Sequence, residues 1–210
     1  MNKSNYCTFY IVRHGESEWN AARIMQGQAT NINPLTNLGE TQAQSIGKKL
    51  SSIHFDKVFS SDLLRAQQTA EIISLDRKLA ILTATALRER TFGHMEGKTY
   101  EEFYQKFEKI IAQKETFAHQ QRKSIKYAPD IESDDEVITR LTTFLREVAV
   151  AQAGKTVLIV SHGGPIRLLL QHLGWSGGKK LQPGFVPNTG YIKLRGDGID
   201  FFVDEVVTSI

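Results

Sequence analysis

Continuous apolar runs occur near both ends of the chain, and each is typical of a strand buried on both faces. Residues 7–12 and 156–160 are such runs, and the pattern is expected of a parallel sheet covered by helices on both sides. Shorter runs at 57–60 and 79–82 predict further strands. The last strands are expected between residues 191 and 207, joined by a glycine-containing turn at 196–198.

Between these runs, apolar residues recur at helical spacing, and residues suited to a helix N-terminus precede them. The expected start residues are Thr36, Ser61, Thr99 and Ser133, with Pro165 in the first turn of a later helix. Thr99 and Ser133 are each followed three residues later by a glutamate, which is the spacing of a capping box. Strands that alternate with helices predict a three-layer α/β sandwich.

A chain of 210 residues is long enough for one well-buried core, so we expect a single domain over residues 1–210. The segment at about 98–130 interrupts the alternation of strands and helices. Its apolar residues lie at helical spacing, and we therefore expect a small helical insertion there.

Candidate chemistry lies where the predicted strands end. Arg13 and His14 follow the first strand directly, His162 follows the strand at 156–160, and Arg65 comes soon after a third strand. Because ligands of open α/β sheets bind outside the carboxyl ends of the strands, we expect these side chains to converge. The helix after His162 would aim free N–H groups at the same place, as is usual for an anion, and Gly163 lets the backbone come close.

This set of side chains is suited to phosphoryl transfer. A neutral imidazole is a good nucleophile toward phosphorus when a second hydrogen bond fixes its tautomer and cations stabilise the phosphoryl oxygens. Arginine binds such oxygens in pairs. Glu89 is the candidate proton donor to the leaving oxygen, provided burial or the bound phosphate keeps it protonated. A plain salt bridge of Glu89 with Arg88 or Arg90 is the alternative role. This scheme requires no metal and no cofactor.

The segment Arg13-His14-Gly15-Glu16-Ser17-Glu18-Trp19-Asn20 resembles the signature of the histidine phosphatase superfamily, in its phosphoglycerate-mutase-like branch. Supporting segments follow in the family's order: Met25-Gln26-Gly27, Pro34-Leu35-Thr36, Ser60-Ser61-Asp62-Leu63-Leu64-Arg65-Ala66-Gln67-Gln68-Thr69-Ala70, Leu87-Arg88-Glu89-Arg90 through Glu96-Gly97-Lys98, and Val160-Ser161-His162-Gly163-Gly164. The resemblance extends over most of the chain. It implies a mixed, mainly parallel sheet between helices.

The resemblance also implies roles for individual residues. His14 would become phosphorylated, and Glu89 would protonate the leaving oxygen and later activate water. The phosphoryl group would be held by Arg13, Arg65 and His162. Additional donors and substrate contacts would come from Asn20, Gln26, Gly27 and the backbone N–H of Gly163.

Three functions fit this set of residues. The first is a metal-independent phosphomonoesterase that hydrolyses a small phosphorylated metabolite through a phosphohistidine. The second is a cofactor-dependent phosphoglycerate mutase. The family's mutases carry a longer segment, rich in basic residues, between the regions of Glu89 and Ser133, whereas here the segment is short and Glu96-Gly97-Lys98 resembles the phosphatases. The third is a phosphate-binding protein without turnover, which would not need an acid at Glu89.

Composition limits the partners and the location. A net charge of +3 does not require nucleic acid or an anionic membrane as partner. An exposed sheet edge or an apolar helix face could support a homodimer. The single cysteine, Cys7, fits a reducing compartment, and the first apolar stretch is too short for a signal peptide. We therefore expect a cytoplasmic protein.

Overall fold

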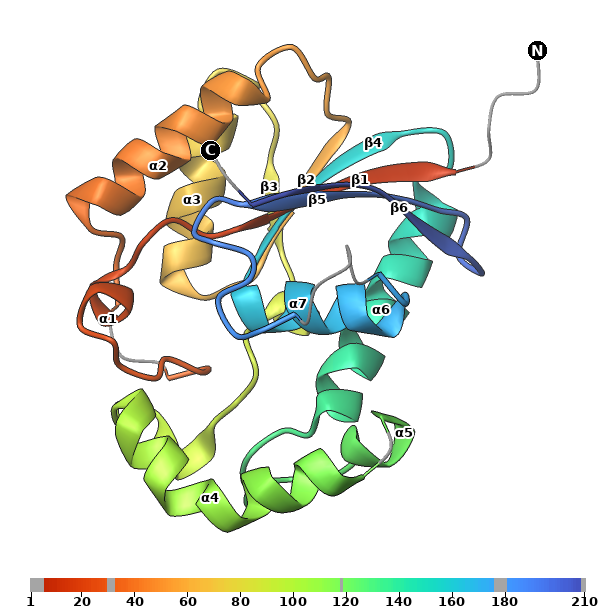
Figure 1. Ribbon diagram of the computed structural model, residues 1–210. Helices are drawn as coiled ribbons and strands as arrows, with labels where there is room; N and C mark the ends of the chain where they lie inside the picture. The colour runs from red at the N-terminus through yellow and green to blue at the C-terminus, as the bar shows by residue number, and fades with distance from the viewer. Residues whose placement is uncertain (1–5, 30–32, 118, 176–180, 209–210) are drawn as a thin grey trace.

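The computed structural model describes residues 6–29, 33–117, 119–175 and 181–208. Its strands are β1 (Cys7–Arg13), β2 (Lys57–Ser60), β3 (Ile81–Thr83), β4 (Thr156–Ser161), β5 (Tyr191–Gly196) and β6 (Phe201–Val207). They form one six-stranded sheet in the order β3-β2-β4-β1-β5-β6 (Figure 1). Pairs among β1, β2, β3 and β4 are parallel, whereas β5 and β6 are antiparallel additions. The expected mixed, mainly parallel sheet is confirmed.

Helices cover both faces of this sheet, which confirms the three-layer sandwich. The helices are α1 (Glu18–Ala21), α2 (Asn37–Lys49), α3 (Leu64–Ser74), α4 (Tyr100–Thr116), α5 (His119–Arg122), α6 (Asp134–Ala151) and α7 (Gly163–His172), with 3₁₀ turns η1 (Thr85–Leu87) and η2 (Gly93–Met95). Helices α2 and α3 pack on one face, and α6 and α7 pack on the other. In the described part of the chain, no helix combines the length and the apolar character that crossing a lipid bilayer requires.

The position of strand β1 explains why the apolar run at residues 7–12 is nearly continuous. Phe9 and Ile11 belong to the core beneath α6 and α7, and Tyr10 and Val12 belong to the core beneath α2 and α3. Because successive side chains of a strand point to opposite faces, a strand covered on both faces needs apolar residues at every position.

Most predicted helix starts are confirmed by their caps. The side chains of Thr36, Thr99 and Ser133 accept hydrogen bonds from backbone N–H groups in the first turns of α2, α4 and α6. The prediction for Ser61 is wrong, because α3 begins only at Leu64. The Ser61 hydroxyl contacts the His162 ring and accepts from the Leu63 backbone N–H, and Leu63 is the residue that precedes the helix.

Other element boundaries differ slightly from the predictions. Strand β3 starts two residues later than expected and ends at Thr83, and the turn between β5 and β6 lies at residues 197–200. Leu38 and Leu64 are apolar residues of the predicted helices, yet they are exposed. Both lie in the first turns of α2 and α3.

The segment expected as an insertion contains α4 and α5, which lie apart from the sheet in Figure 1. It has its own small apolar cluster, in which Phe103 and Phe107 pack with Met25, Met95 and Ile131. The cluster therefore joins α4 to the segments around residues 25 and 95. The division of the chain into a domain and an insertion stays a prediction.

Candidate active site

The register of the sheet places the two strand-end histidines side by side. Arg13 of β1 pairs with Ser161 of β4 in a parallel ladder, and the next residue of each strand is a histidine. The rings of His14 and His162 have centroids 5.0 Å apart, and both residues are buried. The topology thus brings together residues that are 148 positions apart (162 − 14).

The His14 imidazole has a defined tautomer. Its Nδ1 lies 2.7 Å from the carbonyl oxygen of Gly15, and because a carbonyl only accepts hydrogen bonds, Nδ1 carries the proton. The pKa of His14 is held well below its usual value by burial, and further by the charges of Arg65 and Arg13. The ring is therefore neutral at neutral pH, with a lone pair on Nε2.

Arg65 faces that lone pair from the start of α3. Its Nε donates to His14 Nε2 at 3.3 Å, and one terminal nitrogen donates to the Gly27 carbonyl at 3.0 Å. Thr69, one turn later, donates to the Arg65 carbonyl and accepts from the Gly15 backbone N–H. Burial lowers the pKa of Arg65 to about 10, so the guanidinium remains charged at neutral pH.

Arg13 immediately precedes His14, at the end of β1. One terminal nitrogen donates to the Val186 carbonyl at 2.8 Å. Its Nε is buried and has no hydrogen-bond partner within the described structure. A Cβ added to Gly163 would lie 3.2 Å from that Nε, so the glycine leaves space for the guanidinium.

The His162 ring is held by Ser61, which directly follows β2. Its Nε2 lies 2.9 Å from the Ser61 hydroxyl, whereas Nδ1 is buried without a partner in the described residues. Burial, followed by the charge of Arg65, holds the pKa of His162 well below its usual value. His162 and Arg13 thus each have an unpartnered buried nitrogen in the described structure, and both could donate to a bound anion.

Glu89 reaches the site from the irregular segment after η1. Its carboxylate accepts from the backbone N–H of Arg90 at 2.8 Å and from that of Gly164, in the first turn of α7, at 3.1 Å. A Cβ on Gly164 would overlap Glu89 Oε1. Burial lowers the pKa values of Arg13 and Arg65, and the charge of Glu89 partly offsets this effect in both, so the carboxylate lies near both guanidinium groups.

The alternative of a salt bridge to a neighbouring arginine is not what the described residues show. Arg88 forms a bidentate ion pair with Asp62, with distances of 2.7 and 2.6 Å, and Arg90 pairs with Asp134. Each neighbouring cation therefore has its own carboxylate. Glu89 is held by backbone donors instead.

The expected substrate-binding residues are near the site, but part of their hydrogen-bonding capacity is used internally. Asn20 Oδ1 accepts from the Ser17 backbone at 3.2 Å and from Asn188 at 3.3 Å. Gln26 is buried, and its Oε1 accepts from the Ser17 hydroxyl and from Asn33. Ligand contacts by Asn20, Gln26, Gly27 and Gly163 stay predictions.

Several residues that build the site were not singled out from the sequence. Asn188 donates to the His14 carbonyl at 3.0 Å, and it lies in an irregular segment without periodic signal. Ser61 and Thr69 lie within the segments that carry the family resemblance. That resemblance is the sequence feature that could have identified them as site residues. Tyr100 of α4 also lies near the site, because burial and the charge of Glu89 raise its pKa while Arg13 lowers it.

The arrangement has the parts needed for phosphoryl transfer. It offers a neutral nitrogen that accepts from Arg65, unpartnered nitrogens on Arg13 and His162 in the described structure, and a carboxyl group at a helix N-terminus. Cations and oriented N–H groups in a buried site stabilise charge on transferred phosphoryl oxygens. The same donors would also hold a phosphate that does not react.

Comparisons with known proteins point to one family. The model of the histidine phosphatase superfamily (branch 1) matches residues 9–208. A broad-specificity phosphatase of Saccharomyces cerevisiae is 37% identical over 180 residues, covering 81% of this chain and 71% of the yeast protein. Phosphoglycerate mutase-like protein 4 of Arabidopsis thaliana is 36% identical over 169 residues, covering 80% and 71%. The crystal structure of a phosphoglycerate mutase from Bacillus anthracis superposes with a TM-score of 0.85 at 27% identity, covering 99% of this chain and 95% of that one.

Proposed function

Because the chain belongs to the histidine phosphatase superfamily, branch 1, we propose that it hydrolyses small phosphorylated metabolites through a phosphohistidine at His14. The observation that carries this proposal is the buried, neutral imidazole of His14, whose Nε2 faces the guanidinium of Arg65. The similarity to a broad-specificity phosphatase supports hydrolysis.

In the first half-reaction, His14 Nε2 attacks phosphorus while the bond from phosphorus to the ester oxygen breaks. Arg65 turns its Nε from the imidazole to a phosphoryl oxygen, and Arg13 Nε and His162 Nδ1 donate to the others. Protonated Glu89 transfers its proton to the leaving oxygen, so an alcohol departs. The charge that develops on Glu89 is stabilised by the N–H groups of Arg90 and Gly164.

In the second half-reaction, the Glu89 carboxylate removes a proton from water, whose oxygen attacks phosphorus. The bond from phosphorus to His14 Nε2 breaks, which releases inorganic phosphate. The His14 ring regains its lone pair, and Glu89 is again protonated. The cycle uses only side chains of this chain and water, and it needs neither a metal nor a cofactor.

The first experiment asks whether a phosphoenzyme forms and where its phosphoryl group goes. Rapid-quench mixing with an activated aryl phosphate should trap an acid-labile, alkali-stable phosphate on the wild type, and inorganic phosphate should accumulate. Rapid isomerisation of 3-phosphoglycerate with negligible phosphate release would indicate a mutase instead. Absence of both phosphoenzyme and turnover across a panel of phosphorylated metabolites would indicate a phosphate-binding protein.

The second experiment tests the acid. Glu89→Gln keeps the shape of the side chain but removes its proton, and general acid catalysis is worth about 10²–10⁴-fold. We expect a loss of that size for alkyl phosphates, whose leaving groups need a proton, and a much smaller loss for an activated aryl phosphate. Equal losses for both classes of ester would exclude the acid role of Glu89.

A further inference from the structure

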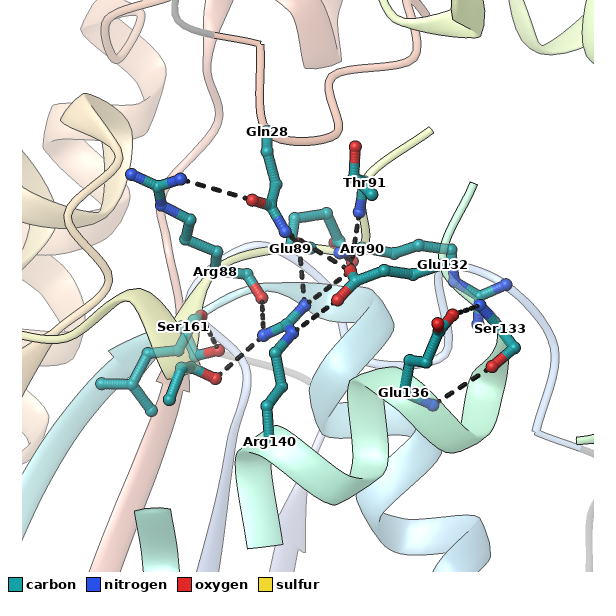
Figure 2. A network of polar contacts seen from close by, with 12 residues as sticks. Gln28, Arg88, Glu89, Arg90, Thr91, Glu132, Ser133, Glu136, Arg140 and Ser161 are labelled. Carbon is teal, nitrogen blue, oxygen red and sulfur yellow. Dashed lines mark hydrogen bonds and ion pairs between the residues drawn. The ribbon is translucent and has the colours of Figure 1, made fainter. Parts of the chain in front are cut away.

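Another arginine, Arg140, which is not among the expected phosphate ligands, holds the backbone at Glu89. Arg140 lies on α6, and its guanidinium donates to three carbonyls of the segment before and at the acid (Figure 2). One terminal nitrogen donates to Ala86 O at 2.9 Å and to Arg88 O at 2.8 Å, and the other donates to Glu89 O at 2.9 Å. This segment forms only the short turn η1 and then runs irregularly, so its carbonyls lack the ladder of a strand.

The guanidinium is itself oriented by Glu132, which precedes α6. Glu132 accepts from Arg140 Nε at 2.9 Å and from a terminal nitrogen at 3.0 Å. The two side chains are only 19% and 18% exposed. Glu132 also accepts from the backbone N–H of Thr91 at 2.9 Å, so the pair binds the chain on both sides of Glu89.

The same network reaches the loop that carries Gly27. Gln28 donates to Glu89 O at 2.8 Å and to Glu132 at 3.4 Å, as Figure 2 shows. The carbonyl of the preceding residue, Gly27, accepts from Arg65. The backbone at Glu89 and the Arg65 guanidinium therefore bind to adjacent residues of the same loop, Gln28 and Gly27.

We infer that Arg140 is a positioning residue, which fixes the backbone at Glu89 so that its carboxyl group stays between Gly164 and the ester oxygen. The inference rests on the proposed function, because it assigns Arg140 a role through the acid. Arginine suits this task because its planar donors can bridge several acceptors at once, and charge-assisted bonds are stronger than neutral ones. Misplacement of a catalytic group by about 1 Å can cost about 10²-fold in rate.

The test compares Arg140→Gln with the wild type on two substrates. An alkyl phosphate, whose leaving group needs the proton, should lose about 10²-fold in kcat, whereas an activated aryl phosphate should lose much less. Turnover of the aryl ester also reports that the variant is folded. Equal losses for both esters would overturn the inference.

A double-mutant cycle shows whether Arg140 acts through Glu89. In the Glu89→Gln background there is no proton to position, so adding Arg140→Gln should change alkyl phosphate turnover by less than about threefold, because residues that act as a unit are non-additive. Additive losses would mean that Arg140 acts elsewhere, and they would overturn the inference.

Arg77 provides a matched control. It also donates to three backbone carbonyls, those of Leu50, Ile53 and Ile73, but it follows the end of α3 opposite to Arg65. Arg77→Gln should lower stability and leave the ratio of alkyl to aryl turnover unchanged. If Arg77→Gln shifts this ratio as much as Arg140→Gln does, the effect is general loosening of the fold and the inference fails.

A milder variant covers the case in which Arg140→Gln does not fold. Glu132→Gln retains an acceptor but loses the charge that orients the guanidinium, so the same ratio should shift in the same direction by a smaller factor. An unchanged ratio in a folded Glu132→Gln variant would overturn the inference. Phosphoenzyme on the wild type is measured in parallel: its absence refutes the proposed function, whereas its presence with unshifted ratios refutes only the role of Arg140.

Discussion

The ends of β1 and β4 carry the same short pattern, an apolar strand followed by histidine and glycine, yet their surroundings differ. After β1, His14 donates through Nδ1 to the neighbouring Gly15 carbonyl, and its Nε2 faces Arg65. After β4, His162 contacts the Ser61 hydroxyl through Nε2, and its buried Nδ1 has no partner among the described residues. One ring is therefore set up to give a lone pair, and the other has a nitrogen free to bind an anion.

This difference teaches that the role of a strand-end histidine depends on its second hydrogen bond. A carbonyl partner dictates the tautomer, because it only accepts, whereas a hydroxyl can donate or accept. Both rings have equally buried positions and lowered pKa values. Burial alone therefore does not distinguish the proposed nucleophile from the proposed phosphate ligand.

The largest expected effect separates the two histidines directly. His14→Ala should abolish the phosphoenzyme and reduce turnover to background, because the attacking nitrogen is lost. His162→Ala should still form a phosphoenzyme but lose about 10²–10³-fold in kcat, the usual cost of one oxyanion donor. Rapid-quench labelling and steady-state assays measure both. A phosphoenzyme that persists in His14→Ala would reverse the assignment of the two roles.

The glycines that follow the two strand-end histidines also differ in what surrounds them. A Cβ on Gly164 would overlap the Glu89 carboxylate, whereas a Cβ on Gly15 would overlap the backbone of Gly39. Gly164→Ala should therefore displace the acid and lower alkyl phosphate turnover by about 10²-fold. Gly15→Ala should mainly lower the free energy of unfolding, by about 1–3 kcal/mol.

Urea denaturation and turnover assays on both glycine variants distinguish these effects. Gly47→Ala in α2 is the control, because its Cβ would lie 3.5 Å from Ile73 Cα, an ordinary contact, and alanine favours a helix by up to about 1 kcal/mol. If Gly164→Ala loses stability but keeps full alkyl phosphate turnover, the carboxylate is not seated at α7 during the reaction.

A smaller effect is expected at Ser61, the partner that distinguishes His162 from His14. Ser61→Ala removes the hydrogen bond to the His162 ring and the acceptor of the Leu63 backbone N–H. A hydrogen bond is typically worth about 0.5–1.5 kcal/mol, so kcat should fall by about 2–10-fold as the His162 ring loses its orientation. The phosphoenzyme should still form. A loss as large as that of His162→Ala would mean that Ser61 itself contacts the substrate.

The two rings should also share a pH dependence of stability, which does not distinguish between them. Their pKa values are lowered in the folded state, so below about pH 6.5 the unfolded chain binds protons that the folded protein does not. The free energy of unfolding should therefore fall as pH decreases from 6.5, by at most about 1.4 kcal/mol per pH unit for each histidine. Above pH 6.5 these groups contribute no slope.

Urea denaturation of the wild type, His14→Ala and His162→Ala between pH 5 and 7.5 checks this prediction. In each variant the free energy of unfolding should depend less steeply on pH, because up to one proton fewer is taken up on unfolding. His172, whose pKa is lowered mainly by partial burial, contributes equally to all three proteins. An identical slope in wild type and variants would mean that the rings are protonated in the folded state.

Local sequence was sufficient for much of the fold. The apolar runs predicted the buried strands, and the caps at Thr36, Thr99 and Ser133 predicted helix starts, because strand burial and capping depend on neighbouring residues. Ser61 shows the limit of this reasoning. Its hydroxyl is equally suited to cap a helix, but it contacts the ring of His162, 101 residues away in the sequence.

The sequence by itself determined that two histidines follow buried strands, and that arginines and a glutamate accompany them. Only the tertiary structure decided which ring has its tautomer set, what holds Glu89 in place, and that Asn188 and Arg140 support the site. The physical reason is that these interactions act over different distances along the sequence. Periodicity and capping act within a few residues, whereas the partner of a buried polar group depends on which distant segments pack together.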